Sequence, residues 1–215
     1  MASKFRRKLA KSFKRSLRSR AFAVSVVATV LVASTIAYNG YMQNRRLTVD
    51  PSSYERLLGL IASVESKNNY NAYFGNAANS SIDFTAMTVA DVMHWQAEHV
   101  AQGNASNAVG RYQIISGTLS GLVSRLNIDP SAKFDQPLQD RMAIALLERR
   151  GAERYVNKEL TQEEFAANLA KEWAALPSVT GADPQASYYA GDGLNKSLVS
   201  VDKVLSAIEP IRAQE

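Results

Sequence analysis

The chain has 215 residues, of which 46% are hydrophobic and 21% charged, and its formal net charge is +5. This composition is that of a globular protein rather than a disordered one, and the length leaves room for one enclosed domain with appendages. The chain contains no cysteine, which excludes disulfides and a thiol nucleophile.

The positive charge is concentrated in a leader, residues 1–20. This leader holds nine basic residues and no acidic one, so the remainder has 16 basic against 20 acidic residues, a net charge of −4. Phe5, Leu9, Phe13 and Leu17 recur every four residues and would form an apolar stripe on a cationic helix, which suits an anionic membrane surface. A disordered arm or a nucleic-acid contact is the competing interpretation. Because the rest of the chain is acidic, we expect no nucleic-acid partner.

Residues 21–38 are uncharged and mostly apolar. As a helix they would span about 26 Å at ~1.5 Å per residue, enough for a bilayer core. The basic flank predicts a single-pass protein with its N-terminus in the cytoplasm (or in a virion interior) and its later residues outside, in the periplasm. Two alternatives stay open: a signal peptide cleaved near Thr35-Ile36-Ala37, and a weakly inserting segment that later leaves the bilayer. A polar linker, residues 39–52, would keep the following domain, 53–209, close to the membrane, and residues 210–215 form a tail.

The domain opens with a helix whose apolar residues recur at helical spacing, namely Tyr54, Leu57, Leu58, Ile61 and Val64. Ser52 and Glu55 predict a capping box at its start. Glu65 would lie at the edge of the apolar stripe, where desolvation raises the pKa of a carboxyl and suits it to act as a general acid. The alternative is a glutamate that ends a helix and points to water.

A loop rich in asparagine and aromatic residues follows, from Ser66 to Ser81. Amides beside aromatic rings suit the hydroxyl groups, N-acetyl groups and ring faces of sugars, although an ordinary polar loop would look the same. A small hairpin between Asn71 and Thr85 is the one place where the pattern allows strands.

Further helices follow, so the pattern predicts a mainly α domain. Thr88 with Asp91 and Thr161 with Glu164 form capping boxes, Asp135 and Pro137 open a helix that Gly151 closes, and Ser197 to Ile208 forms the last helix. Val100 and Leu198 are expected on the buried faces of their helices, toward the core of the domain. His94 and His99 do not share a helix face, so we expect no metal site, and nothing indicates another cofactor.

Five segments, in the same order, resemble the lysozyme-like lytic transglycosylases, and most closely the endolysins of phage lambda and its relatives. They are Glu65-Ser66, Gly110-Arg111-Tyr112-Gln113-Ile114, Gln139-Asp140, Glu148-Arg149-Arg150-Gly151-Ala152 and Trp173-Ala174-Ala175-Leu176-Pro177. Ser66, where the lambda enzyme has glycine, is similar to the cellular soluble transglycosylases. Tyr188-Tyr189-Ala190-Gly191 resembles their Tyr-Asn-Ala-Gly segment, with Tyr189 in place of asparagine. The likeness covers about Tyr54 to Gly193.

The resemblance implies an α+β lysozyme-like fold and a site for peptidoglycan glycan strands. By this resemblance Glu65 would be the catalytic acid and base, Tyr112 and Gln113 would line the glycan cleft, and the ring of Tyr188 would lie against the catalytic carboxyl. Ser66, next to Glu65, and Asn69, from the amide-rich loop, are further candidate substrate contacts. The implied reaction is lytic transglycosylation of the bond between N-acetylmuramic acid (MurNAc) and N-acetylglucosamine (GlcNAc).

Three other questions stay open at the level of the sequence. A muramidase of the same fold and a non-catalytic peptidoglycan-binding protein are the alternatives to a transglycosylase. A phage lysis protein, a virion component and a cellular enzyme all fit the architecture. The sequence does not indicate an oligomeric state or a preference for particular peptide stems.

Overall fold

The structure, a computed structural model, describes residues 51–212. The predicted leader, the predicted membrane segment and residues 39–50 of the linker lie outside these residues. Within the described residues, no helix is both long and apolar enough to cross a membrane. The described chain is part of one compact unit that begins at Val49.

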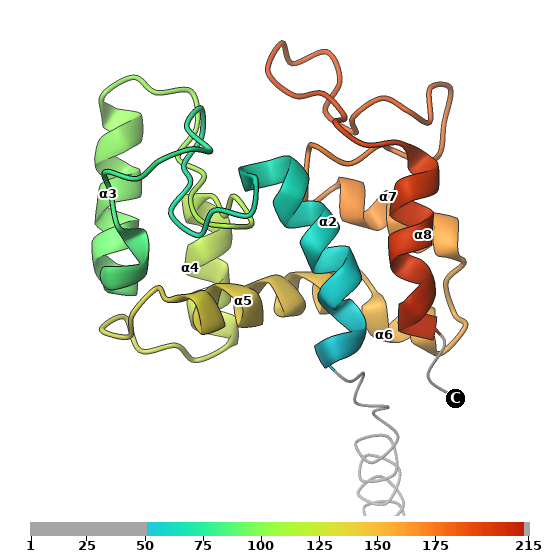
Figure 1. The fold of residues 1–215 in the computed structure, drawn as a ribbon, viewed down its shortest axis with the longest axis horizontal. Helices are drawn as coiled ribbons and strands as arrows, with labels where there is room; N and C mark the ends of the chain where they lie inside the picture. The colour runs from blue at the N-terminus through green and yellow to red at the C-terminus, as the bar shows by residue number, and fades with distance from the viewer. Residues whose placement is uncertain (1–50, 213–215) are drawn as a thin grey trace, which may run out of the picture. The chain divides into compact units, whose positions relative to one another are not determined.

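The described domain is mainly helical, as the sequence predicts, and loops join its helices (Figure 1). Its helices are η1 (Pro51–Tyr54), α2 (Glu55–Ser66), η2 (Phe84–Ala86), α3 (Val89–Ala101), α4 (Ser116–Arg125), α5 (Gln136–Arg149), α6 (Ala152–Val156), α7 (Gln162–Ala170) and α8 (Val201–Arg212). In place of the predicted hairpin, residues 51–212 contain only isolated bridges, among them Tyr73 with Asn76 and Tyr73 with Val109.

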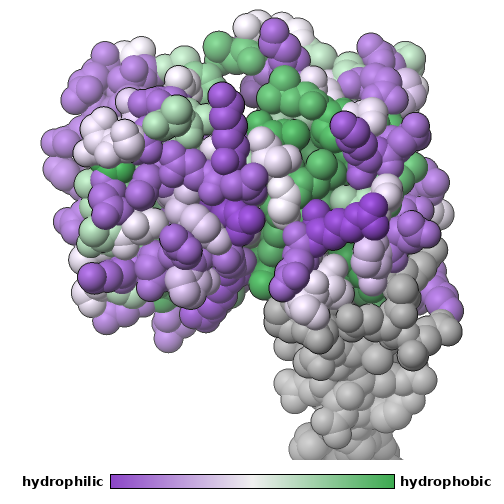
Figure 2. All heavy atoms as spheres, viewed as in Figure 1, coloured by the Kyte–Doolittle hydropathy of each residue, from purple (hydrophilic) through white to green (hydrophobic). Residues whose placement is uncertain are grey.

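Helix α2 lies in the middle of the domain and packs against α8 and η1, while α3 packs against α4 on the other side (Figure 1). Leu57 and Ile61 of α2 are completely buried, in agreement with the predicted apolar stripe. Figure 2 shows hydrophobic side chains gathered over the middle of the face in view, and mostly hydrophilic side chains on the side of α3 and α5. The middle of the domain, where α2 lies, is therefore where apolar surface reaches the outside on this face.

Local sequence signals fix most helix ends. Both capping boxes, at Thr88 and at Thr161, are present, and Asp135 caps α5 by accepting a hydrogen bond from a backbone N–H of its first turn. Gly151 follows α5 with a φ of 105°, a left-handed conformation that glycine adopts without strain. These predictions are confirmed.

Other boundary predictions are wrong. Residues 51–54 form a 3₁₀ turn, so α2 begins after Tyr54, and the Tyr54 side chain does not cap it. The last helix begins at Val201 and continues to Arg212, so it includes half of the predicted tail. Val100 and Leu198 are exposed by 46% and 59% rather than facing the core.

Candidate active site

Glu65 is the next-to-last residue of α2, and the chain turns sharply after it. Lys67 and Asn68 both have positive φ values, 53° and 65°. The N–H of Asn68 donates to the carbonyl of Ala62 at 3.0 Å, which satisfies one of the carbonyls left open at the helix end. A left-handed backbone is costly for residues other than glycine. Contacts with the rest of the fold therefore offset this cost at Lys67 and Asn68. The turn ends the helix directly after the candidate acid.

A groove of about 510 Å³ runs past Glu65. Its walls come from the end of α2, from the loop after it, from Gln113, from the turn after α7 and from the loop before α8. The residues that line it are Val64, Glu65, Lys67, Tyr73, Phe74, Gly75, Asn76, Ala77, Ala78, Gln113, Ala174, Ala175, Leu194, Asn195, Lys196 and Leu198. The groove therefore combines aromatic, amide and cationic side chains around a single carboxyl.

The surroundings of Glu65 favour its protonated form. Burial of the carboxyl raises its pKa from 4.5 to about 7, and the N–H of Ala175, which donates to Oε1 at 3.2 Å, offsets part of this rise. Among residues 51–212, no cation lies within ion-pair distance of Glu65. Arg111, which belongs to the neighbouring Gly110–Gln113 segment, pairs with Asp140 at 3.2 Å instead. At neutral pH the carboxyl is thus close to half protonated, as a general acid requires.

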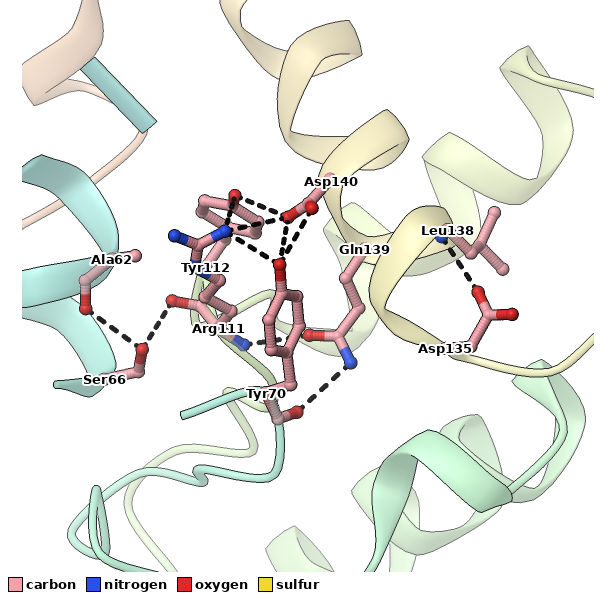
Figure 3. A network of polar contacts seen from close by, with 9 residues as sticks. All are labelled: Ala62, Ser66, Tyr70, Arg111, Tyr112, Asp135, Leu138, Gln139 and Asp140. Atoms are coloured by element: carbon pink, nitrogen blue, oxygen red, sulfur yellow. Dashed lines mark hydrogen bonds and ion pairs between the residues drawn. The ribbon is translucent and has the colours of Figure 1, made fainter. Parts of the chain in front are cut away.

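The segment Gly110–Gln113 is fixed from several sides (Figure 3). The hydroxyl of Ser66 donates to the carbonyl of Arg111 at 2.7 Å, and the N–H of Arg111 donates to Oε1 of the buried Gln139 at 2.9 Å. The indole N–H of Trp173 donates to the carbonyl of Tyr112 at 3.2 Å. Because Ser66 adjoins Glu65, these bonds set the position of the candidate acid relative to Gln113.

Gly110 makes this arrangement sterically feasible. Its φ is 78°, and a Cβ at this position would overlap Oε1 of Gln139. The group that approaches this glycine so closely is the buried side-chain amide of Gln139 in α5.

Asp140 gathers three donors beside this segment (Figure 3). It accepts hydrogen bonds from the hydroxyl of Tyr112 at 2.6 Å, from the hydroxyl of Tyr70 and from Arg111. Burial and the adjacent carboxylate both raise the pKa of Tyr112. Tyr70 is shifted in the same direction by the same causes. This network ties α5 to the loop after α2, and it engages Arg111, so that this cation does not neutralise Glu65.

The structure brings only some of the predicted site residues into the groove. Glu65 and Gln113 line it, and the side-chain N–H₂ of Gln113 donates to the carbonyl of Gly110 at 3.0 Å. Ser66 and Tyr112 are buried and bonded as described above. Tyr188 is 53% exposed, packs edge-on against the neighbouring Tyr189 and is not among the groove residues.

Asn69 and its neighbours are committed to the loop itself. The amide of Asn69 donates to the carbonyls of Ala77 and Asn79 at 3.0 and 2.8 Å. Asn79 is 5% exposed and bonds the backbone on both sides of the loop, including the carbonyl of Ile82. Asn76 does line the groove. Most of the amides that the sequence suggests for sugar binding therefore hold the loop together.

Sequence reasoning missed several groove residues. Ala175, whose N–H contacts Glu65, belongs to a segment that carries the family resemblance but that is not among the predicted site residues. Lys67 and Lys196 lie on the rim, and Leu198 is expected in the core. No local pattern marks these positions, because they reach the groove through irregular loops.

The other acids near Glu65 in the sequence lie elsewhere. Asp83 caps η2 by accepting from the N–H of Thr85, and Glu98 pairs with His94 at 3.1 Å on the exposed face of α3. Glu65 is the only carboxylate among the described residues that line the groove. The described part of the chain also contains no cluster of three or more His, Cys, Asp or Glu side chains arranged to hold a metal ion.

Comparison with known proteins agrees with this geometry. A family model described as Endolysin matches residues 57–192, which include most of α2, the groove residues from Val64 to Ala175 and the helices between them. No curated protein and no solved structure matches the chain. The family match covers more than half of the chain, and we conclude that the protein belongs to the endolysin family and is a cell-wall enzyme that degrades peptidoglycan.

Proposed function

We propose that the protein is a lytic transglycosylase that cleaves the β-1,4 bond between MurNAc and GlcNAc in peptidoglycan. The observation that carries the proposal is that Glu65, with a pKa raised to about 7, is the only carboxylate among the described groove residues. Glycoside hydrolysis normally uses two carboxylates, one as acid and one as base or nucleophile. A reaction that needs a single carboxylate fits this groove better.

In the proposed reaction Glu65 acts twice. Its protonated form gives a proton to the glycosidic oxygen as the bond from that oxygen to C1 of MurNAc breaks. Its carboxylate then takes the proton from the 6-hydroxyl of the same MurNAc, whose oxygen bonds to C1 and closes a 1,6-anhydro ring. The proton returns to Glu65, and no water is consumed. The N–H of Ala175 stabilises the carboxylate between the two steps.

The groove supplies means to hold the sugar during these steps. The rings of Tyr73 and Phe74 offer faces for pyranose rings, and Asn76 and Gln113 offer amides for hydroxyl and N-acetyl groups. We propose Gln113 as the principal polar contact among the residues that the family resemblance indicates. Ser66, Asn69 and Tyr112 act by positioning, through the bonds described above.

Digestion of purified sacculi by the full-length protein and by its Glu65→Gln variant tests the proposal. Mass spectrometry of the released muropeptides should find 1,6-anhydro-MurNAc ends, and the variant should release none. Reducing MurNAc ends would instead indicate a muramidase with a second carboxylate supplied from elsewhere. If the wild-type protein binds sacculi and releases nothing, the protein is a binding module.

We also propose that residues 21–38 hold the enzyme at a membrane, with the described domain on the outer side. The support is the uncharged length of this segment and the basic leader before it. Protease added to spheroplasts, whose outer membrane has been opened, should degrade the domain and leave a membrane-bound leader fragment. A domain that is protected from this protease would refute the orientation.

A further inference from the structure

A second, more enclosed hollow of about 230 Å³ lies next to the groove. Gln113 lines both of them, and the turn after α7 contributes Glu172 and Trp173 to the hollow and the next two residues to the groove. The hollow is thus separated from the groove by little more than the Gln113 segment. A substituent on a sugar bound in the groove needs to cross only this segment to reach the hollow.

The hollow carries more positive than negative charge. Arg149 and Arg150, from the end of α5, and Lys171, from the end of α7, line it together with one acid, Glu172. Arg149 bonds both oxygens of Glu172 at 2.7 Å, and Arg150 bonds one of them at 2.7 Å. Two of the three cations thus bond one carboxylate, which is nearly covered, with its side chain 6% exposed, while Lys171 does not bond it.

The guanidinium groups keep donors for a ligand. Arg149 uses only Nη2 within residues 51–212, and its side chain is 38% exposed. Arg150 uses Nε and Nη2 and is 27% exposed. Among the described residues, the ammonium of Lys171 donates one hydrogen bond, to the side chain of Asn168 at 3.2 Å, and lies 6.0 Å from the centre of the Tyr188 ring. Forked guanidinium donors in a half-buried setting match a carboxylate well.

We propose that this hollow binds a carboxylate of the peptide stem that hangs from the lactyl group of MurNAc. The proposal rests on the proposed function, because it takes the glycan to lie in the groove beside Glu65. The stem leaves the sugar ring close to the scissile bond and carries free carboxylates along a short chain. When the stem runs past Gln113, one of its carboxylates reaches Arg149 and Lys171. The enzyme then prefers glycan that carries peptide.

The first experiment compares kcat/KM of the full-length protein on glycan chains with peptide stems and on the same chains stripped of stems by an amidase. Wild type should favour the peptide-bearing chains. Lys171→Gln and Arg149→Gln should each reduce this preference by about tenfold, the loss expected for a hydrogen bond to a charged group. Arg154→Gln removes an exposed cation of α6 outside the hollow and should keep the wild-type preference. Tryptophan fluorescence verifies that each variant is folded.

The second experiment needs no catalysis. Calorimetry measures binding of a free stem tetrapeptide, with its carboxylates either ionised or amidated, to the Glu65→Gln protein. The ionised peptide should bind about tenfold more tightly. Equal binding of the two peptides, or an unchanged preference in both hollow variants, overturns the proposal. If the ionised peptide binds tightly while wild type cleaves neither glycan, the hollow is supported and the transglycosylase assignment fails.

Discussion

Replacing Glu65 with glutamine should make the protein more stable at alkaline pH while abolishing its activity. Folding raises the pKa of Glu65 from 4.5 to about 7, so the folded state holds this proton more tightly than the unfolded state does. The proton on Glu65 therefore stabilises the folded state fully below pH 4.5, and this contribution declines as the pH rises toward 7 and is absent above it. At ~1.4 kcal/mol for each pKa unit, the wild-type protein loses about 3 kcal/mol over this interval. Glutamine does not titrate, so the variant does not share this loss.

Urea denaturation of the two proteins between pH 4 and pH 9 measures the effect. Both tryptophans of the chain, Trp95 and Trp173, lie in the described domain, so their fluorescence reports unfolding of this domain within the full-length protein. The free energies of unfolding should agree near pH 4 and differ by about 3 kcal/mol at pH 8. Glu209→Gln, which removes an exposed carboxylate from α8, is the control for losing one negative charge. A difference between Glu65→Gln and wild type that does not change with pH would refute the argument from burial.

The same titration should limit catalysis. The first step uses protonated Glu65, so kcat/KM should fall about tenfold for each pH unit above about 7. Stopped assays on purified glycan measure this dependence directly. A rate that stays level up to pH 9 would show that another group donates the proton.

Other substitutions test the segment that faces Glu65. Gly110→Ala should lower the free energy of unfolding, measured by urea denaturation, by about 3 kcal/mol, because alanine is strained at this φ and its Cβ displaces the amide of Gln139. Gly103→Ala is the control: its φ is 90° but the space around it is open, so it should lower the free energy of unfolding by only about 1 kcal/mol. Asp140→Asn should lower the free energy of unfolding by about 2 kcal/mol, because three donors lose a charged acceptor, and a loss below about 0.5 kcal/mol would contradict the network of Figure 3. Gln113→Ala should lower kcat/KM about tenfold with a stability change within about 0.5 kcal/mol, and a variant with full activity would exclude this amide as a substrate contact.

Most of the fold could be predicted because helix caps, helix-ending glycines and apolar stripes each depend on residues that are close in the sequence. Thr88 and Thr161 cap their helices because the partner that each needs lies three residues away, and Gly151 ends α5 through its own backbone. The stripe on α2 places Glu65 at a boundary between core and solvent. The prediction for Leu198 failed because apolar residues keep helical spacing through this position, although α8 begins only at Val201. Periodicity alone does not show where a helix begins.

The site was less predictable because its contacts join distant segments. The N–H that contacts Glu65 comes from Ala175, 110 residues away. Asn69 and Asn79 look like sugar ligands in the sequence, but the loop that contains them forms few regular backbone bonds. Their side chains supply the missing partners, as buried backbone groups require.

The first residues of the described chain hold the N-terminal end of α2, the helix that carries Glu65, in place. Tyr54 is 3% exposed, and η1 contacts both α2 and α8, so residues 51–54 belong to the folded core rather than to a tether. From there α2 runs 12 residues, about 18 Å, to the active site. If residues 21–38 anchor the enzyme, as proposed above, a protease cut before Pro51 would release it with the contacts of η1 to α2 and α8 intact. A cut a few residues later would remove these contacts from the start of the catalytic helix and would destabilise it.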